Sequence, residues 1–286
     1  MLKPNQYEKD MHAGNIRSRL HNADRIVIKV GSSTITYNNA KPNLTNISRL
    51  VRVIADLTNQ GKKVVLVTSG AIAIGIGRLD LVKKPDTVRE KQAMATVGQC
   101  ELMNIYSRLF SEYGHIVGQM LLTRDVTEND IRRHNVTNTF ESLFHKGIIP
   151  IVNENDSVAV EEIKFGENDT LSAIVAKLIK ADLLILLSDI EGLYETDPRK
   201  NPNAKMISIV EEVTDDIQAC AAGAGTERGI GGMVTKLYAG KIATFAGTDM
   251  VIANGEDPSI IIDIINGKDV GTLFVSRKRK GERENE

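Results

Sequence analysis

The sequence is poor in cysteine and in aromatic residues. Its 286 residues include two cysteines and no tryptophan, and aromatic residues make up 4% of the chain. Cys100 and Cys220 belong to no C-x-x-C pair, which indicates neither a zinc site nor a disulfide framework but reduced thiols. Because few aromatic rings are available, a stacking surface for single-stranded nucleic acid is disfavoured. A pocket for a small polar ligand suits this composition better.

The sequence also has no charge excess, no metal-type histidine spacing and no long apolar run. Lysine and arginine total 36 against 37 aspartate and glutamate, a formal net charge of −1, which removes the usual electrostatic argument for a nucleic-acid or membrane partner. The five histidines show no H-x-x-x-H spacing, which argues against a zinc hydrolase. The aliphatic run at residues 183–187 is far shorter than the roughly 20 residues that cross a bilayer. With no secretory signal visible, we expect a cytoplasmic protein.

Short β-branched segments alternate with longer helical patterns along most of the chain. The predicted strands span residues 25–30, 63–68, 115–122, 148–152, 183–188, 249–253 and 272–275. The predicted helices span residues 44–59, 88–110, 131–144, 170–179, 233–246 and 258–265. This alternation predicts an α/β fold, in which a mostly parallel sheet carries helices on both faces as a three-layer α/β/α sandwich.

The two ends of the chain carry no such pattern. We expect a polar N-terminal extension at residues 1–22, a folded domain at residues 23–276 and a charged tail at residues 277–286. Two long segments inside the domain, 153–168 and 189–232, are also irregular. Long irregular segments in a compact α/β domain usually serve function.

Glycine-rich turns follow the first two predicted strands, and a third glycine-rich segment precedes a helix. The first turn contains Lys29 and Gly31, the second contains Ser69 and Gly70, and the third leads to Lys236. Such turns let backbone N–H groups approach an anion closely. Each turn could instead be purely structural, but three of them with two lysines favour an anion site. The segments fit neither a P-loop nor a G-x-G-x-x-G fingerprint.

Amide and carboxylate side chains gather in the segment NENDSVAVEEIKFGENDT, residues 153–170. Asn153, Asp156, Asn168 and Asp169 stand out because they follow a predicted strand. A solvated acidic loop or an adventitious cation site is the alternative interpretation. Carboxylates and amides at the carboxyl end of a strand suit a zwitterionic ligand, because they bind both an ammonium and a carboxylate group.

These segments together resemble the amino-acid kinase family, and within it the branch that phosphorylates glutamate. The resemblance rests on VIKVGSS, VTSGAIAIG, NEND followed by KFGENDTLSA, LLSDIEGLYETDPRKNP and GIGGMVTK, in the family's order over residues 24–276. It implies the family's three-layer fold, with a substrate-binding part at about residues 23–180 and a nucleotide-binding part at about residues 181–276. Many members carry a C-terminal domain of the RNA-modification (PUA) type, and we expect none in this chain.

The resemblance implies transfer of the γ-phosphoryl group of ATP to the side-chain carboxylate of L-glutamate, the first step of proline biosynthesis. By motif, Lys29 and Lys236 would contact the phosphates, and Asp169 would orient both lysines. The glutamate-binding positions would be Ser69, Gly70, Asn153, Asp156 and Asn168. The ATP-binding positions would be Lys29, Gly31, Ser188, Asp189, Ile230, Gly231, Gly232, Met233, Val234, Thr235 and Lys236.

The same resemblance implies several partners. Mg²⁺ would accompany ATP, although no protein ligand for it can be identified from the sequence. Proline would act as a feedback inhibitor, the chain would form a dimer or tetramer, and glutamyl phosphate reductase would receive the product. Three alternatives remain open: a kinase of the same family acting on aspartate, N-acetylglutamate or carbamate, a noncatalytic nucleotide or amino-acid sensor of the same fold, and, least favoured, an NAD-dependent oxidoreductase.

Overall fold

A computed structural model describes residues 16–277 apart from 82, 84, 159–166, 199, 216 and 219–229. Most of the expected N-terminal extension, residues 1–15, lies outside the described residues, as do residues 278–286 of the expected tail. The glycine-rich residues 223–229 and the acidic residues 161 and 162 lie outside them as well.

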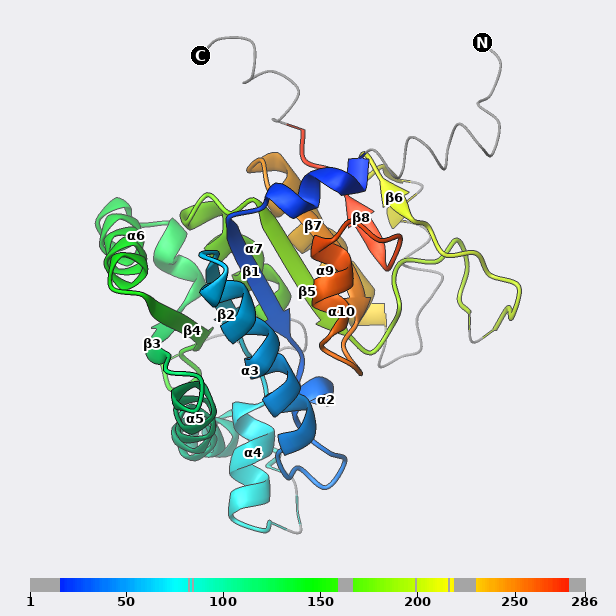
Figure 1. The fold of residues 1–286 in the computed structure, drawn as a ribbon. Coiled ribbons are helices and arrows are strands. Elements are labelled where there is room, and N and C mark those ends of the chain that lie inside the picture. The colour runs from blue at the N-terminus through cyan, green and yellow to red at the C-terminus, as the bar shows by residue number, and fades with distance from the viewer. Residues whose placement is uncertain are drawn as a thin grey trace, which may run out of the picture.

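The described residues form one eight-stranded sheet in the order β3-β4-β2-β1-β5-β7-β8-β6 (Figure 1). The strands are β1 Arg25–Val30, β2 Lys63–Val67, β3 Ile116–Leu122, β4 Ile148–Glu154, β5 Leu183–Ser188, β6 Ile209–Val210, β7 Asp249–Asn254 and β8 Thr272–Phe274. All neighbouring pairs run parallel except β7 and β8. The prediction of a mostly parallel α/β sheet is therefore confirmed.

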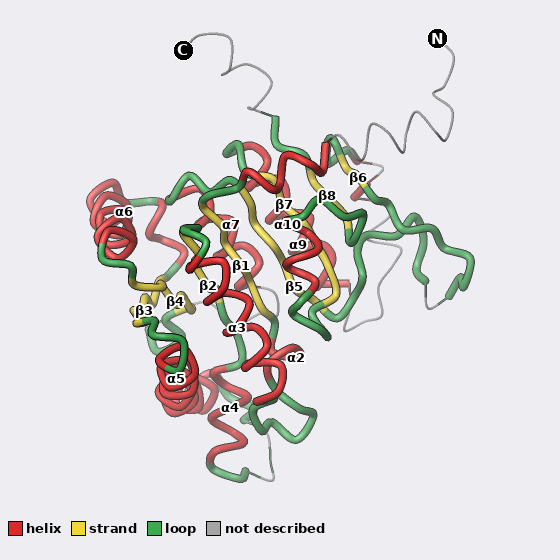
Figure 2. Tube along the Cα trace, in the orientation of Figure 1, coloured by secondary structure: helices red, strands yellow, loops and turns green. Residues whose placement is uncertain are grey.

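Helices connect the strands and cover both faces of the sheet (Figure 2). They are α2 Ser32–Ile35, α3 Leu44–Asn59, α4 Ala71–Arg78, α5 Val88–Ser111, α6 Asp130–His145, α7 Glu167–Leu178, α9 Ile230–Phe245 and α10 Ile260–Ile265, with short 3-10 helices η1 Arg19–Asn22 and η2 Arg124–Thr127. Local sequence sets some of their ends. Thr87 and Glu90 form a capping box at the start of α5, in which each side chain accepts a bond from the other residue's backbone N–H.

Alternate residues of β1 serve two separate hydrophobic clusters. Ile26 and Ile28 pack with residues of α3, α5 and α10 on one face of the sheet. Val27 packs with residues of α6, α7 and α9 on the other face. Side chains of a strand point to opposite faces in turn, so β1 is buried on both sides. This arrangement makes the molecule a three-layer α/β/α sandwich.

Two glycines allow α4 and α5 to pack backbone against backbone. A Cβ atom at Gly98 would overlap the carbonyl oxygen of Ala71, and one at Gly75 would overlap that of Met94. Larger residues at these positions would therefore force the helices apart. Since α4 begins directly after the glycine turn at Ser69 and Gly70, this contact brings the middle of α5 close to that turn.

The N-terminal segment differs from the expected polar extension. Arg17 is fully buried, and Leu20 is 2% exposed within the core. The Arg17 guanidinium donates to the carbonyl oxygens of Val270, Ser208 and Gly271 at 3.0, 2.9 and 3.0 Å. Residues 16–22 are therefore part of the domain. Their polar composition concealed this role, because an arginine can be buried where backbone carbonyls accept its N–H groups.

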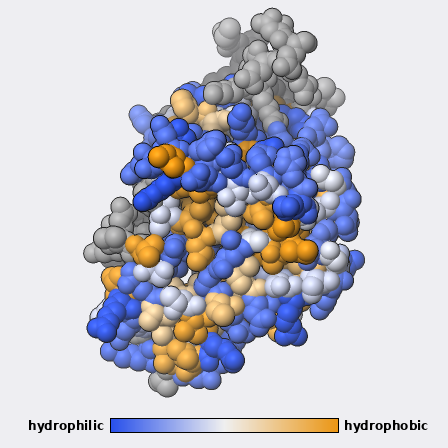
Figure 3. All heavy atoms as spheres, turned by 90° about the vertical axis from the view of Figure 1, so that its left-hand side faces the viewer, coloured by the Kyte–Doolittle hydropathy of each residue, from blue (hydrophilic) through white to orange (hydrophobic). Residues whose placement is uncertain are grey.

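One side of the molecule, around the edge strand β3, carries exposed apolar side chains. Figure 3 views this side and shows hydrophobic surface among hydrophilic residues. Ile116 of β3 is 67% exposed and Ile131 of α6 is 73% exposed. Within the described residues, no helix is both long and apolar enough to cross a membrane.

Candidate active site

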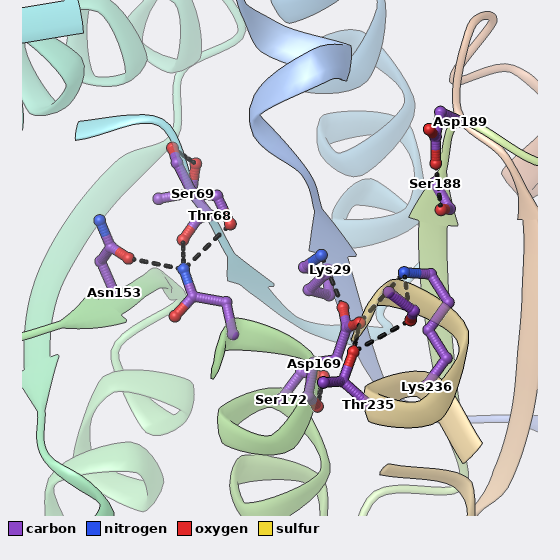
Figure 4. Close-up of polar contacts among 12 residues, drawn as sticks. Lys29, Thr68, Ser69, Asn153, Asp169, Ser172, Ser188, Asp189, Thr235 and Lys236 are labelled. Atoms are coloured by element: carbon purple, nitrogen blue, oxygen red, sulfur yellow. Dashed lines mark hydrogen bonds and ion pairs between the residues drawn. The ribbon is translucent and has the colours of Figure 1, made fainter. Parts of the chain in front are cut away.

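The carboxyl ends of four parallel strands bring polar groups together at one edge of the sheet. Lys29 lies near the end of β1, Ser69 follows β2, Asn153 lies near the end of β4, and Ser188 ends β5. The first turn of α7 adds Asn168 and Asp169, and the first turns of α9 add Thr235 and Lys236, as Figure 4 shows for the labelled residues. Open α/β sheets bind ligands at this edge.

Asp169 holds the two predicted lysines together at the centre of the site. Its Oδ1 lies 2.6 Å from the Lys29 Nζ, and its Oδ2 lies 3.1 Å from the Lys236 Nζ. The Thr235 hydroxyl also donates to Oδ2 at 3.1 Å. Asp169 is fully buried, and the two lysines are 7% and 8% exposed. Both predicted lysines therefore contact the same buried carboxylate, and the orienting role of Asp169 stays a prediction.

The charges of this cluster change the proton affinities of its members. Burial lowers the pKa of Lys29, and repulsion from Lys236 lowers it further, against the attraction of Asp169. For Asp169, burial acts to raise the pKa, but the ammonium groups of Lys29 and Lys236 outweigh burial and keep the pKa below its ordinary value. Asp169 is therefore an anion at neutral pH, and the cluster with both lysines charged has a net charge of +1.

The second cluster consists of amide side chains and lies next to the first along α7. The Asn168 Nδ2 donates to the Thr68 carbonyl at 2.8 Å, to the Ser69 hydroxyl at 3.0 Å and to the Asn153 Oδ1 at 3.0 Å. The Asn153 Nδ2 donates in turn to the Gln99 Oε1 at 2.8 Å. The structure thus joins Ser69, Asn153 and Asn168, three of the predicted glutamate-binding residues, in one network.

Gly70 shapes the turn between β2 and α4. Its φ angle is +88°, a left-handed conformation that side-chain-bearing residues rarely adopt, and a Cβ atom there would lie 3.0 Å from the Ile35 Cδ1. Gly31 caps the start of α2 with an extended backbone and has more space around it. The left-handed turn at Gly70 starts α4 directly after Ser69, so the N–H groups of its first turn are free to face an anion.

The predicted nucleotide-binding residues lie at β5 and at the start of α9. The Ser188 hydroxyl donates to the Asp189 Oδ1 at 3.0 Å, and Asp189 is exposed. Residues 230–236 form the first turns of α9, where Met233 is buried and Val234 is 47% exposed. Among the described residues, no atom lies within 4 Å of a Cβ position at Gly232. These residues therefore leave space for a ligand beside Gly232.

Asp156, another predicted glutamate-binding residue, lies in the turn after β4 and is half-buried.

No group of three or more His, Cys, Asp or Glu side chains that could hold a metal ion occurs in the described part of the chain. The side chain nearest to such a role at the centre, Asp169, already contacts both lysines.

Sequence reasoning missed three residues that support the amide cluster. Thr68 provides the carbonyl that Asn168 contacts, and its hydroxyl lies 3.0 Å from the Tyr106 hydroxyl. Gln99, 9% exposed in the middle of α5, contacts Asn153. The only signal in the sequence was a glutamine at a position of α5 that shares its buried face with Leu102 and Tyr106.

The chain matches a family model and many known proteins. Residues 24–254 match the model of the amino acid kinase family. A glutamate 5-kinase of Clostridium perfringens is 58% identical over 92% of this chain and 99% of its own length. One of Listeria innocua is 54% identical over 93% of this chain and 98% of its own length.

Solved structures show the same fold at low identity. A UMP kinase from Ureaplasma parvum aligns with a TM-score of 0.61 and 15% identity over 89% of this chain and 99% of that protein. A UMP kinase from Bacillus anthracis gives 0.59 and 15% over 88% and 96%. The family model covers most of the domain, and the relatives cover nearly the whole chain at more than half identity. The chain therefore belongs to the amino acid kinase family.

Proposed function

We propose that this protein is a glutamate 5-kinase, which transfers the γ-phosphoryl group of ATP to the side-chain carboxylate of L-glutamate. The products are L-glutamyl 5-phosphate and ADP, and the reaction opens proline biosynthesis. The observation that carries the proposal is the adjacency on α7 of Asp169, which holds two buried lysines, and Asn168, which belongs to an amide cluster. The first suits phosphates and the second suits an amino acid. Relatives at 51–58% identity bear the same name.

The reaction needs positive charge more than it needs a base. An oxygen of the glutamate carboxylate attacks the γ-phosphorus, the bond from that phosphorus to the bridging oxygen breaks, and ADP leaves with the electron pair. No proton has to be removed, because a carboxylate is already ionised at neutral pH. Two anions must approach each other, so the ammonium groups of Lys29 and Lys236 have to offset the charge at the transferring group.

Asp169 keeps these two ammonium groups in place before ATP binds. Because both of its oxygens are in contact with a lysine, Lys29 and Lys236 are held on opposite sides of one carboxylate. Lysine side chains otherwise lose considerable rotamer freedom on binding an anion. We expect Lys29→Ala or Lys236→Ala to lower turnover by at least about 10²-fold, as loss of one charge-stabilising group does elsewhere.

We further propose that Mg²⁺ enters with ATP, bound by phosphate oxygens and water. The described residues offer no acidic cluster for it, and Mg²⁺ commonly keeps several waters when it binds with a nucleotide. The metal supplies additional positive charge to the phosphates when bound. Omission of Mg²⁺ from the assay should abolish product formation without unfolding the protein.

A substrate panel tests the proposed activity. Purified protein is incubated with ATP, Mg²⁺ and one acceptor, and both ADP release and trapping of the acyl phosphate by hydroxylamine are measured. L-Glutamate should support both signals, whereas aspartate, N-acetylglutamate and carbamate should not. Equal activity with aspartate would show a different member of the family. ATP binding without any turnover would favour a noncatalytic sensor, and thermal stabilisation by NAD would revive the oxidoreductase alternative.

We also propose that the chain forms a homo-oligomer, a dimer or tetramer, through the side that carries β3. Support comes from the exposed Ile116 and Ile131 and from the open edge of β3, since exposed strand edges pair readily with another chain. Analytical ultracentrifugation of the wild type and of Ile116→Lys tests this. A monomeric wild type would contradict it.

Proline is the expected feedback inhibitor, and we propose that it binds in the same amide cluster as glutamate. It shares with glutamate an α-carboxylate and a charged amine, the groups that amides recognise. Inhibition should then be competitive with glutamate and not with ATP. A purely noncompetitive pattern would place proline elsewhere.

We also propose that the product passes directly to glutamyl phosphate reductase, because acyl phosphates hydrolyse readily in water. A coupled assay with the two enzymes mixed or separated by a membrane would test this.

A further inference from the structure

The hydrogen bonds of the amide cluster determine which way each amide points. The backbone N–H of Glu154 donates to the Asn153 side chain at 2.9 Å. A backbone N–H can only donate, so the atom that it contacts must be the Asn153 Oδ1. The Asn153 Nδ2 then faces Gln99, and the Gln99 atom at 2.8 Å must be the acceptor, Oε1.

The opposite end of the network is fixed by a group that can only accept. The Thr68 carbonyl lies 2.8 Å from the Asn168 amide. The Asn168 atom that faces it must therefore be the donor, Nδ2, which agrees with its 3.0 Å contact to the Asn153 Oδ1. One backbone donor and one backbone acceptor thus set the orientation of three side-chain amides in sequence.

This orientation leaves one acceptor and one donor without a partner. Among the described residues, the Asn168 Oδ1 and the Gln99 Nε2 are buried and make no hydrogen bond. A buried polar atom without a partner costs about 1–3 kcal/mol. A methionine at position 99 would avoid the unpaired donor and would fill a similar volume. A glutamine at this position is explained if its Oε1 is required as the acceptor for the Asn153 Nδ2.

We propose that Gln99 is a positioning residue of the glutamate pocket. Through Asn153 it holds the Asn168 amide with Oδ1 free to accept the α-ammonium group of the bound amino acid. The inference rests on the proposed glutamate 5-kinase activity and adds the reason for the choice of an amino acid over a plain dicarboxylate. Gln99 itself contacts Asn153 and acts through it.

The network makes the direction of the effect clear. Without the Gln99 Oε1, the Asn153 Nδ2 loses its acceptor, and Asn153 can turn to reach another one. Asn153 would then no longer offer Oδ1 to Asn168, and the Asn168 amide would lose the contact that, with Thr68, fixes its direction. Ligand binding would suffer at the ammonium group and not at the phosphates, because Lys29 and Lys236 contact Asp169 and not this network.

Gln99→Met tests the proposal, with Leu102→Val as a matched control on the same buried face of α5. We measure kcat and KM for L-glutamate, KM for ATP, and kcat/KM for glutarate, which lacks the ammonium group. Gln99→Met should raise the KM for glutamate about tenfold, equivalent to one lost charge-assisted bond, and should reduce the preference for glutamate over glutarate. Its KM for ATP should stay within about twofold of the wild type. Leu102→Val should lower the melting temperature and leave both preferences unchanged.

Gln99→Glu separates the two atoms of the glutamine. Gln99→Glu keeps an acceptor for Asn153 and removes the unpaired Nε2. The preference for glutamate over glutarate should therefore be retained or increase, even if the added negative charge raises the KM for both substrates. It also serves as the test if Gln99→Met does not fold. An unchanged glutamate KM in folded Gln99→Met, an equal rise in Leu102→Val, or loss of the preference in Gln99→Glu would each overturn the proposal. A wild type that does not phosphorylate glutamate would overturn the proposed function and this inference together.

Discussion

Replacement of Asp169 by asparagine tests the central ion cluster most directly. Asp169 is fully buried and contacts Lys29 at 2.6 Å and Lys236 at 3.1 Å. The asparagine side chain would have nearly the same shape, and its oxygen could still accept from one lysine. Its NH₂ group would face the second ammonium, and the two buried positive charges would have no anion between them.

The structure sets the size of the stability loss. Removal of one partner from a buried ion pair costs about 3–5 kcal/mol, because an uncompensated charge remains. Each kcal/mol shifts the melting temperature by about 2–4 °C in a domain of this size, so Asp169→Asn should melt about 6–20 °C below the wild type. Deprotonation of one lysine would reduce this loss, since burial already lowers the pKa of Lys29.

Ligands should reverse part of that loss. In Asp169→Asn the triphosphate of ATP would replace the lost carboxylate as an anion for Lys29 and Lys236, whereas in the wild type it competes with Asp169. Saturating ATP should therefore raise the melting temperature of the variant more than that of the wild type. Turnover should still fall by at least about 10²-fold, because the lysines are no longer held at fixed positions.

Asp249→Asn is the matched control for this experiment. Asp249 is also fully buried and forms an ion pair with Arg19 and a 2.8 Å bond from the Ser276 N–H. Asp249 starts β7 and pairs with Leu183 at the start of β5. It therefore lies at the amino ends of the strands, whereas the site lies at their carboxyl ends. The control should lose stability with unchanged turnover and an unchanged ATP shift. A wild-type turnover in Asp169→Asn, or the same ATP shift in both variants, would refute the reasoning.

Three further predictions concern acidity, helix packing and the N-terminal segment. The pKa of Asp169 lies below the ordinary value of 3.8. The ionised Asp169 carboxylate therefore stabilises the fold fully above pH 3.8, and this stabilisation is lost as the pH falls through the lowered pKa. The difference in melting temperature between wild type and Asp169→Asn should be constant above about pH 5 and should shrink below 3.8. Gly98→Ala should cost about 1–3 kcal/mol or more and raise the KM for glutamate, because its Cβ overlaps the Ala71 carbonyl at the start of α4; an unchanged melting temperature would contradict this contact. Arg17→Met should cost about 3 kcal/mol by chemical denaturation, because three carbonyls lose a buried donor, with kcat and KM unchanged.

Hydrophobic patterns predicted each strand of the described sheet except β6. The strands at 25–30 and 183–188 were predicted with the bounds that the structure gives, because both are apolar runs buried on both faces. β6 was missed, since two residues carry no periodicity. No bounds were predicted for α4, which contains Gly75 and Gly77. Because these glycines have no side chain, α4 can pack closely against the backbone of Met94 and of Ala40.

Apart from the expected contacts of Asp169 with the two lysines, the site was predicted as a set of residues and not as a network. Motif resemblance named Lys29, Asp169 and Lys236, and their mutual contacts follow once the strand order brings β1 next to β5 and α7 against α9. Gln99 could not be named in this way. Its role depends on the close approach of α4 and α5 and on two backbone groups, Thr68 C=O and Glu154 N–H, whose direction no sequence pattern specifies.

The start of α7 places Asn168 in the amide cluster and Asp169 in the ion cluster. The sequence predicted this helix from residue 170, because residues 167–169 are polar and resemble a loop, but the helix begins at Glu167. Consecutive helical residues point about 100° apart, so Asn168 turns toward β2 and β4 while Asp169 turns toward Lys29 and Lys236. Under the proposed function, the amino acid and the phosphates would therefore be contacted through adjacent residues of one helical turn. Under the proposed function, a shift of this turn would displace the contacts of both substrates together.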